Sequence, residues 1–324
     1  MDRVNVIIGA NGRIGREYVR YLINEKNQEV ISVSRIPNPE FSQNPLVKSV
    51  VGQDLIARDW KNLEIALDRD DLRIFYLAGR HNTPNGVRED YTSIHVDAPK
   101  RLISLASKKQ NPFIYFSSDH VFGNAVGRGF SEDSIPDPRQ DYYGYSKRVG
   151  ELETLAYSEG YVLRSETVLG IEGDFLDTSL RKLRRGGECE VWEDHYHKFA
   201  GINQVCLTLA KIAKYQEMNE LTTDSNQHET PDSFGRQRVF HVAFDDVPMS
   251  MHHLVKSFAV FFESRGLLSE GAHKKAKLIP SPGGPRSFSL NTDLTRRELG
   301  LQGRKLIPSL QERRVHGYLD FDKI

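Results

Sequence analysis

Residues 4–15 read VNVIIGANGRIG, and this stretch decides the predicted fold. The β-branched run Val4–Ile8 predicts a buried parallel strand, and apolar residues at helical spacing follow from Ile14. We expect Gly9 to allow the tight turn out of the strand, Gly12 to let the backbone approach a pyrophosphate, and Gly15 to let the helix pack closely. The N-terminus of that helix would then face the anion. A tight turn without a ligand is the alternative interpretation. The predicted clamp consists of Gly9, Asn11, Gly12, Arg13, Ile14 and Gly15.

Composition narrows the class of partner. The 324 residues contain 44 Lys and Arg against 44 Asp and Glu, so no net charge attracts the chain to nucleic acid or to a membrane surface. No apolar run approaches the length of about 18 residues that a membrane helix needs. There are two cysteines, Cys189 and Cys206, which favours a reducing, cytoplasmic setting. We therefore expect a globular protein that binds a small molecule.

The second strand, predicted over 29–35, indicates the choice of dinucleotide. Its end lies beside the adenosine ribose in a dinucleotide-binding fold, where a carboxylate would accept hydrogen bonds from the ribose of NAD. This chain has neutral Ser34 there, and Arg35 is suited to pair with the extra phosphate of NADP. The sequence therefore favours NADP, with NAD as the alternative and a solvated loop as the other interpretation of Arg35.

Strand and helix patterns alternate regularly as far as the strand predicted over 72–79, which predicts a doubly wound parallel sheet. The expected fold is α/β: a Rossmann-type sheet with a smaller C-terminal substrate-binding lobe. Residues 1–170 would form the NAD(P)-binding domain, with later returns at about 200–218 and 238–248. Residues 171–199 and 249–324 would form the substrate-binding lobe. Within this plan, 94–107 is expected to be one helix and the polar stretch 222–238 a mobile loop.

A set of three polar residues carries the chemistry. Ser118 ends the predicted fifth strand, and Tyr143 and Lys147 are four residues apart on a predicted helix, so they share one face. The ammonium of Lys147 is expected to lower the pKa of Tyr143 and to hold a ribose hydroxyl. Ser118 would hydrogen-bond the reacting oxygen. A Tyr-x-x-x-Lys pair alone carries little information, and the evidence is the ordered set.

These motifs together resemble the extended short-chain dehydrogenase/reductase superfamily. In that resemblance, Gly9, Gly12 and Gly15 match the cofactor turn, and Ser118, Tyr143 and Lys147 match the catalytic triad. Asp54 and Leu55 match the adenine-contacting pair, and Leu77, Ala78 and Gly79 match the ending of the fourth strand. Within the superfamily, the run 117–122 (SSDHVF), together with 143–147 (YGYSK), looks most like the dTDP-4-dehydrorhamnose reductase branch. The family usually has Asn where His95 stands and Gly where Ala98 stands.

The resemblance also suggests substrate contacts. Asp119 and His120 follow the catalytic serine, and Arg286 stands in the segment by which this branch brings an Arg to the nucleotide of the substrate. The basic residues Arg181, Lys182, Arg184 and Arg185 are better explained as a solvated helix face. His195 and His197 are two residues apart and have no further Cys or His at useful spacing, so no metal site is expected.

The resemblance implies an NADP-dependent reductase of a nucleotide-activated 4-keto-6-deoxysugar, in which Tyr143 donates the proton. One alternative is a sugar-nucleotide epimerase that uses the same three residues. A second alternative is a non-catalytic regulatory subunit that holds NADP, like the regulatory subunit of methionine adenosyltransferase. A dehydratase is disfavoured because His120 stands where those enzymes have Glu. The expected partners are a nucleotide sugar and a second copy of the chain in a homodimer.

Overall fold

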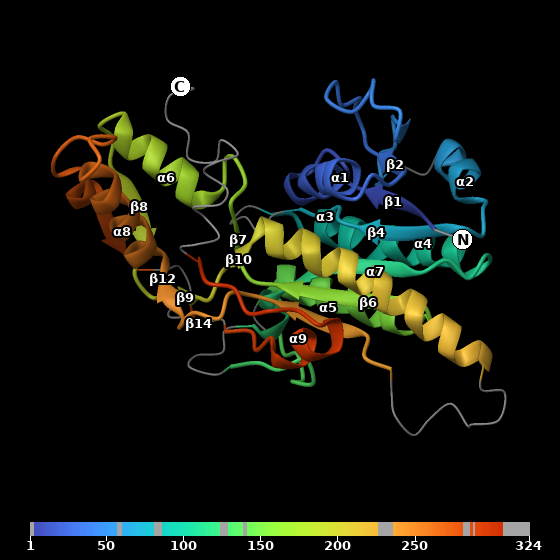
Figure 1. The fold of residues 1–324 in the computed structure, drawn as a ribbon. Coiled ribbons are helices and arrows are strands. Elements are labelled where there is room, and N and C mark those ends of the chain that lie inside the picture. The colour runs from blue at the N-terminus through green and yellow to red at the C-terminus, as the bar shows by residue number, and fades with distance from the viewer. Residues whose placement is uncertain are drawn as a thin grey trace.

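A single parallel sheet organises the N-terminal part of the computed structural model, which describes residues 3–56, 60–80, 86–123, 129–138, 141–225, 236–280, 286–287 and 289–306. Its strand order is β11-β6-β5-β4-β1-β2-β3, and all neighbouring strands run parallel (Figure 1). The strands are β1 (Val4–Ile8), β2 (Val30–Val33), β3 (Val47–Val50), β4 (Leu72–Tyr76), β5 (Phe113–Ser118), β6 (Gly160–Ser165) and β11 (Val239–Val242). The chain order reverses between β1 and β4, which is where doubly wound folds bind their ligands. The predicted Rossmann-type sheet is confirmed.

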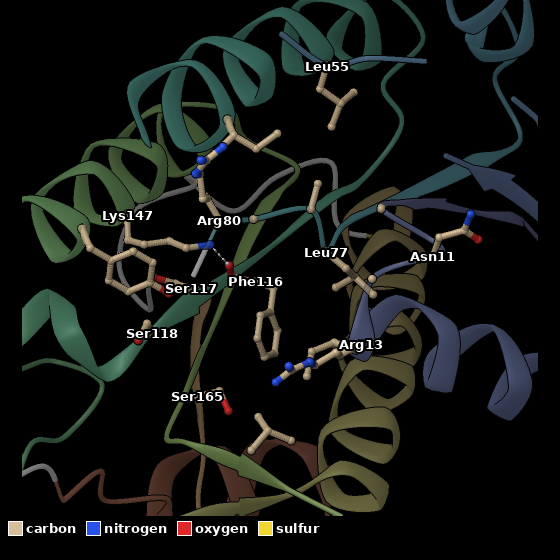
Figure 2. Close-up of a pocket in the computed structure, with 18 of the residues that line it drawn as sticks. Asn11, Arg13, Leu55, Leu77, Arg80, Phe116, Ser117, Ser118, Lys147 and Ser165 are labelled. Atoms are coloured by element: carbon tan, nitrogen blue, oxygen red, sulfur yellow. Dashed lines mark hydrogen bonds between the residues drawn. The ribbon is translucent and has the colours of Figure 1, made fainter. Parts of the chain in front are cut away.

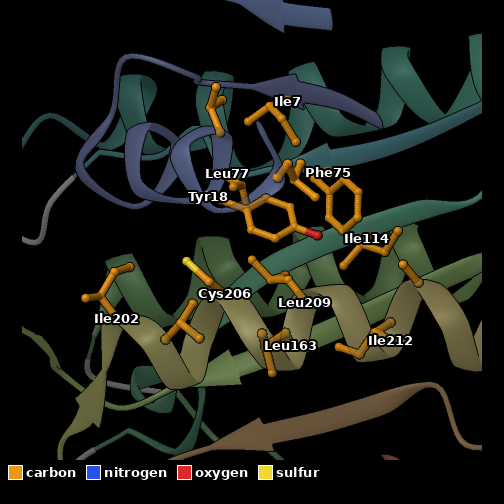
Figure 3. Packing of buried hydrophobic residues seen from close by; sticks show 14 of the residues in the cluster. Ile7, Tyr18, Phe75, Leu77, Ile114, Leu163, Ile202, Cys206, Leu209 and Ile212 are labelled. Atoms are coloured by element: carbon orange, nitrogen blue, oxygen red, sulfur yellow. The ribbon is translucent and has the colours of Figure 1, made fainter. Parts of the chain in front are cut away.

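Helices cover both faces of this sheet. One face packs against α1 (Arg13–Glu25), α7 (Ile202–Ser225) and α9 (Asp293–Leu299). The other packs against α2 (Lys61–Leu67), α4 (Ala98–Ser107) and the end of α5 (Tyr142–Leu155). Figure 3 shows the first of these cores, where Tyr18 of α1 and Phe75 of β4 face Cys206 and Leu209 of α7. The Tyr18 and Phe75 rings meet edge to face at 4.9 Å, so one apolar layer fixes α1, and with it the glycine turn.

The remaining elements form a smaller lobe with its own apolar core, at the left of Figure 1. They are α6 (Phe175–Arg184), β8 (Cys189–Trp192), β9 (His195–His197), β12 (Met249–Ser250), α8 (Met251–Glu263), η3 (Ala272–Lys275), β13 (Ala276–Ile279) and β14 (Arg286–Ser287). The short pair β7 (Val168–Leu169) and β10 (Ala200–Gly201) lies between the lobe and the sheet. The predicted residue boundaries of the two domains stay a prediction.

Two segments differ from expectation. The stretch 94–107 is not one regular helix, because α3 (Arg88–Thr92) passes through a π turn, η1 (Ser93–Asp97), into α4. A period of 3.6 residues in the sequence cannot reveal one extra residue in a turn. Residues 222–225, expected to begin a loop, belong to α7, which continues to Ser225, and 226–235 lies outside the described residues. Each polar residue costs a helix only a few tenths of a kcal/mol, so polar composition alone did not predict where α7 ends.

Among the helices that the structure describes, none combines the length and the apolar character needed to cross a membrane.

Candidate active site

One large cavity opens at the carboxyl ends of the central strands and has a volume of about 920 Å³. That volume is in the upper part of the range of about 300–1,000 Å³ usual for ligand sites. Most of the predicted site residues line it: Gly9, Asn11, Gly12, Arg13, Ile14, Ser34, Arg35, Asp54, Leu55, Leu77, Ala78, Gly79, Ser118, Asp119, His120, Tyr143 and Lys147. In Figure 2, Asn11 and Arg13 lie on one side of the cavity, and Ser118 and Lys147 lie on the other.

The three glycines of the turn serve different purposes. Gly9 has a φ of +87°, and a Cβ there would lie 2.7 Å from the backbone nitrogen of Ala78. Gly15 lies beneath the turn and does not line the cavity, and a Cβ there would lie 2.2 Å from the carbonyl oxygen of Gly9. At Gly12, by contrast, a Cβ would meet only that carbonyl oxygen, at 3.0 Å, and would otherwise occupy open cavity. The turn therefore needs Gly9 and Gly15 to fold, whereas Gly12 leaves space for a ligand.

The groups around this space suit a dinucleotide phosphate. The first turn of α1 contains no acidic residue, and no side chain caps its N–H groups. Asn11 Nδ2 donates to the carbonyl oxygen of Ile36 at 2.7 Å, and Ser34 Oγ donates to the same oxygen at 2.8 Å, which ties the turn to the end of β2. Among the described residues, neither Arg13 nor Arg35 has an acidic partner. Two arginine side chains are thus available to anions in the cavity.

Replacing Gly12 by valine should separate folding from cofactor binding. The backbone of Gly12 has φ −67° and ψ 164°, which any residue adopts, so we expect the variant to fold. The branched side chain would fill the space next to the first turn of α1, and NADPH affinity should fall about 10- to 100-fold, as for an overpacked contact costing roughly 1–3 kcal/mol. Fluorescence titration with NADPH measures this, with Gly12→Ala as the milder control. Affinity within a few-fold of wild type in folded Gly12→Val would show that the phosphates bind elsewhere.

The neighbouring serines at the end of β5 have different partners. Ser117 is buried, and its Oγ donates to Oε1 of Glu151 at 2.7 Å. Ser118 is half-buried, and its Oγ donates to Oδ1 of Asp119 at 2.7 Å and also interacts with Tyr143. The structure therefore places Ser118, rather than Ser117, next to the tyrosine.

Tyr143 and Lys147 lie on α5, whose N-terminus is held by Asp141. Asp141 Oδ1 accepts from the backbone N–H of Gly144 at 3.2 Å, and Oδ2 contacts Nδ1 of His120 at 2.5 Å. The His120 ring in turn meets the Tyr143 ring edge to face at 5.2 Å. The helix cap and the tyrosine are thus positioned by one hydrogen-bonded unit.

The pKa shifts of Tyr143 and Lys147 differ from the sequence-based prediction. Loss of solvent raises the pKa of Tyr143 well above its ordinary value, Asp119 raises it further, and the interaction with Ser118 only partly opposes this. Burial lowers the pKa of Lys147 to about 7, and its Nζ donates to the carbonyl oxygen of Phe116 at 3.0 Å (Figure 2). The expected lowering of the tyrosine pKa by Lys147 is therefore absent in this arrangement, because desolvation dominates for both groups.

His95 stands where the short-chain dehydrogenase/reductase superfamily usually has Asn. It is completely buried in the π turn. Burial, together with the charge of Lys147, lowers the pKa of His95 to about 2, so the imidazole is neutral. Its Nε2 accepts from the backbone N–H of Arg80 at 3.2 Å, which leaves Nδ1 to donate to Ser146 Oγ at 2.8 Å. Ser146 Oγ then donates to the carbonyl oxygen of Tyr143 at 2.8 Å. His95 thereby links the end of β4 to the helix that carries the tyrosine.

Three buried side chains, those of Asp119, Glu166 and His197, lie close together next to Ser118. Nδ1 of His197 lies 3.3 Å from Oε2 of Glu166 and 3.7 Å from Oδ2 of Asp119. Burial raises the pKa of Glu166. Burial also opposes charge on His197, but the two carboxylates outweigh it and raise the pKa of that imidazole to about 9. Asp119 and Glu166 line the cavity.

One predicted substrate residue lies outside the cavity lining, and some lining residues were not predicted from the sequence. Arg286 does not line the cavity; it lies on β14, where its backbone N–H donates to the carbonyl oxygen of Asp194 at 3.0 Å, and its substrate contact stays a prediction. Glu166, Arg80 and Asp90 line the cavity, although the sequence assigned them no role. The signal for Glu166 was available, because it follows β6 at the sheet edge where ligands bind. Arg80 and Asp90 form an ion pair at 3.0 Å across 10 residues, which no spacing rule indicates.

The sequence signature of the NAD dependent epimerase/dehydratase family matches residues 5–199, which include the glycine turn, Ser118, Tyr143 and Lys147. The chain belongs to this family. The predicted family resemblance is confirmed, and with it the prediction of an NAD(P)-dependent type of enzyme.

Similar proteins within and around this family carry several activities. A curated relative, the "Probable low-salt glycan biosynthesis reductase Agl14" of Haloferax volcanii, is 27% identical over 175 residues. The match covers 53% of this chain and 55% of the relative, so the chain spans about half the length of that curated protein.

Solved structures of the family are similar over nearly the whole chain. The dTDP-glucose 4,6-dehydratase DesIV of Streptomyces venezuelae, solved with NAD, has a TM-score of 0.76 at 18% identity and covers 99% of this chain and 98% of its own. The dTDP-4-dehydrorhamnose reductase of Bacillus anthracis, solved with NADP, has a TM-score of 0.72 at 15% identity, covering 98% and 99%. At these identities the likeness establishes the fold alone, and the shared fold extends over nearly the whole chain.

Proposed function

We propose that the protein is an NADP-dependent reductase of a nucleotide-activated 4-keto-6-deoxysugar. The observation that carries this proposal is that Ser118, Tyr143 and Lys147 line the same cavity as the glycine turn of the cofactor clamp. The curated H. volcanii reductase, 27% identical over 175 residues, supports a reductase among the activities of the family.

The proposed roles follow from chemistry and position. NADPH supplies the hydride when bound. The hydroxyl of Tyr143 donates a proton to the oxygen of the reduced carbonyl, since its raised pKa keeps it protonated at neutral pH. Ser118 fixes that oxygen, and Lys147 holds the ribose beside the tyrosine. The first turn of α1, with Gly12 and Arg13, would hold the phosphates.

Substrate contacts are proposed at Asp119 and His120, which line the cavity. Its lining also includes Thr167, Val168, Ile171, Phe175 and Met251. Phe175 begins α6 and Met251 begins α8, so the smaller lobe supplies part of the wall. Arg286 remains a proposed contact for the nucleotide, outside the described cavity wall.

The function can be tested in two steps. A thermal-shift screen of nucleotide sugars with NADPH present identifies ligands, because a ligand that binds only the folded state raises the melting temperature. NADPH oxidation is then followed with the best nucleotide 4-keto sugar, and stoichiometric consumption is expected. Interconversion of sugars with tightly retained NAD and no net redox change would favour the epimerase. Cofactor binding without turnover on any nucleotide sugar would favour the regulatory subunit.

Arg35→Ala tests the proposed preference for NADP. Arg35 lines the cavity at the end of β2 and has no acidic partner among the described residues. Removing a charged hydrogen bond to phosphate should cost about 1.5–3 kcal/mol, which is roughly a 10- to 100-fold loss of NADPH affinity. NADH lacks that phosphate and should lose little. Titration of both cofactors checks this, and equal losses would remove Arg35 from the role.

A further inference from the structure

The cluster formed by Asp119, Glu166 and His197 has no part in the proposed hydride and proton transfers. Its three residues come from separate places in the chain: the start of η2 (Asp119–Phe122), the segment after β6, and β9. All three are at least 97% buried, with exposed fractions of 3%, 2% and 3%. One ligand atom from each residue lies within 4.8 Å of the ligand atoms of the other two.

From this geometry we propose a binding site for one divalent transition-metal ion, such as Zn²⁺ or Mn²⁺. In a tetrahedral site, metal–ligand distances of about 2.0–2.2 Å place neighbouring ligand atoms about 3.3–3.6 Å apart. Nδ1 of His197 lies 3.3 Å and 3.7 Å from the two carboxylate oxygens, and the ligand atoms of all three residues lie within 4.8 Å of one another, so modest side-chain adjustments would bring them into that range. One imidazole nitrogen and two carboxylate oxygens form a donor set typical of first-row divalent ions.

An unsatisfied atom supports the site independently of this spacing. Oδ2 of Asp119 is buried and has no hydrogen-bond partner among the described residues, and Nδ1 of His197 lies 3.7 Å away, beyond hydrogen-bond distance. Buried carboxylate oxygens are rarely left in this state. A cation bound between the three ligand atoms would satisfy it.

The surroundings also have the features of a built site. The other oxygen of each carboxylate is held in place: Oδ1 of Asp119 accepts from Ser118 Oγ and the His120 N–H, and Oε1 of Glu166 accepts from the Leu290 N–H at 2.9 Å. Such outer contacts orient metal ligands. On binding, the metal would displace the proton that His197 holds in the metal-free cluster, and the two carboxylates with the neutral imidazole would then balance a charge of +2. Asp119 and Glu166 line the cavity, which gives the ion a path of entry and lets an oxygen of a bound ligand complete the coordination.

This proposal departs from the expectation of no metal site. That expectation considered His195 and His197 with their neighbours in sequence, whereas the structure joins His197 to residues 31 and 78 positions earlier in the chain. It is also independent of the proposed reductase activity, because the test uses the metal alone.

The test titrates the metal-free full-length protein with Zn²⁺ by calorimetry. One ion per chain is expected, with affinity about tenfold weaker or worse in His197→Gln and in Glu166→Gln. The matched control is His253→Gln, since His253 is an exposed histidine at the start of α8 and should leave the titration unchanged. Wild type that takes up no ion, or binds no more tightly than His197→Gln, would show that the cluster is an imidazolium held between two carboxylates.

Far-UV circular dichroism confirms that each variant is folded. If both cluster variants fail to fold, the proposal can still be tested with wild-type protein that is labelled with ¹⁵N-histidine and loaded with Mn²⁺. Electron paramagnetic resonance should then show coupling of the bound ion to one imidazole nitrogen. Absence of that coupling would overturn the assignment.

Discussion

Tyr143→Phe is expected to lower turnover by about 10²- to 10⁴-fold, which is the usual contribution of a positioned acid. The substitution keeps the ring, which contacts the rings of His95 at 5.4 Å and His120 at 5.2 Å, and removes only the hydroxyl. Packing and folding should therefore be unchanged. NADPH affinity should change little, since the hydroxyl acts on the reacting oxygen.

The measurement is NADPH oxidation with the best nucleotide 4-keto sugar, alongside NADPH binding by fluorescence. Tyr142→Phe is the matched control, because it precedes Tyr143 on α5 and its hydroxyl bonds Thr92 Oγ1 at 2.8 Å, outside the catalytic group. It should retain near-normal turnover. A Tyr143→Phe enzyme that works as fast as the Tyr142→Phe control would end the catalytic assignment.

The strand, glycine turn and helix were largely predictable because they are adjacent in the chain. Strand, glycine turn and helix follow one another within residues 4–25, so local rules of backbone freedom and helix polarity sufficed to place Gly9 and Gly12. Ser118, Tyr143 and Lys147 are separated by at most 29 positions and were joined by a known ordered pattern. A parallel sheet brings the carboxyl ends of its strands together, so residues that follow separate strands in such a pattern can be expected to meet at one site.

Contacts between the two lobes were not predictable in the same way. His197 meets Glu166 and Asp119 only because β9 in the smaller lobe is set against the end of β6, and no periodicity encodes that distance. Electrostatics were also missed. The sequence places a cation near Tyr143, but the sign of the pKa shift depends on how much solvent each group loses, which is a property of the packed structure.

Lys147 offers a test in which stability and function should change in opposite directions. Its exposed fraction is 4%, and burial lowers its pKa from 10.5 to about 7. Below pH 7 the amine is protonated in both folded and unfolded chains, so the folded state carries the full cost of a buried charge. As the pH rises from 7 to 10.5, the folded chain loses the proton while the unfolded chain keeps it, and the wild type gains stability.

Lys147→Met should therefore be more stable than wild type below pH 7, by on the order of 2–4 kcal/mol at about 1.4 kcal/mol per pKa unit, less the hydrogen bond lost to Phe116. This advantage should shrink as the pH rises towards 10.5. The measurement is urea unfolding of both proteins without NADPH from pH 6 to pH 10. A stability difference that stays constant over this range would show that Lys147 is not desolvated as described.

The same variant should be the least active of the set. Removing the ammonium takes away the group proposed to hold the ribose, so NADPH affinity should fall about tenfold or more, and turnover should fall at least as far as in Tyr143→Phe. The losses in the double variant Tyr143→Phe/Lys147→Met should combine less than additively, because both side chains act on one step. Strictly additive losses in turnover would instead mean that Lys147 and Tyr143 act independently, with Lys147 serving the cofactor alone.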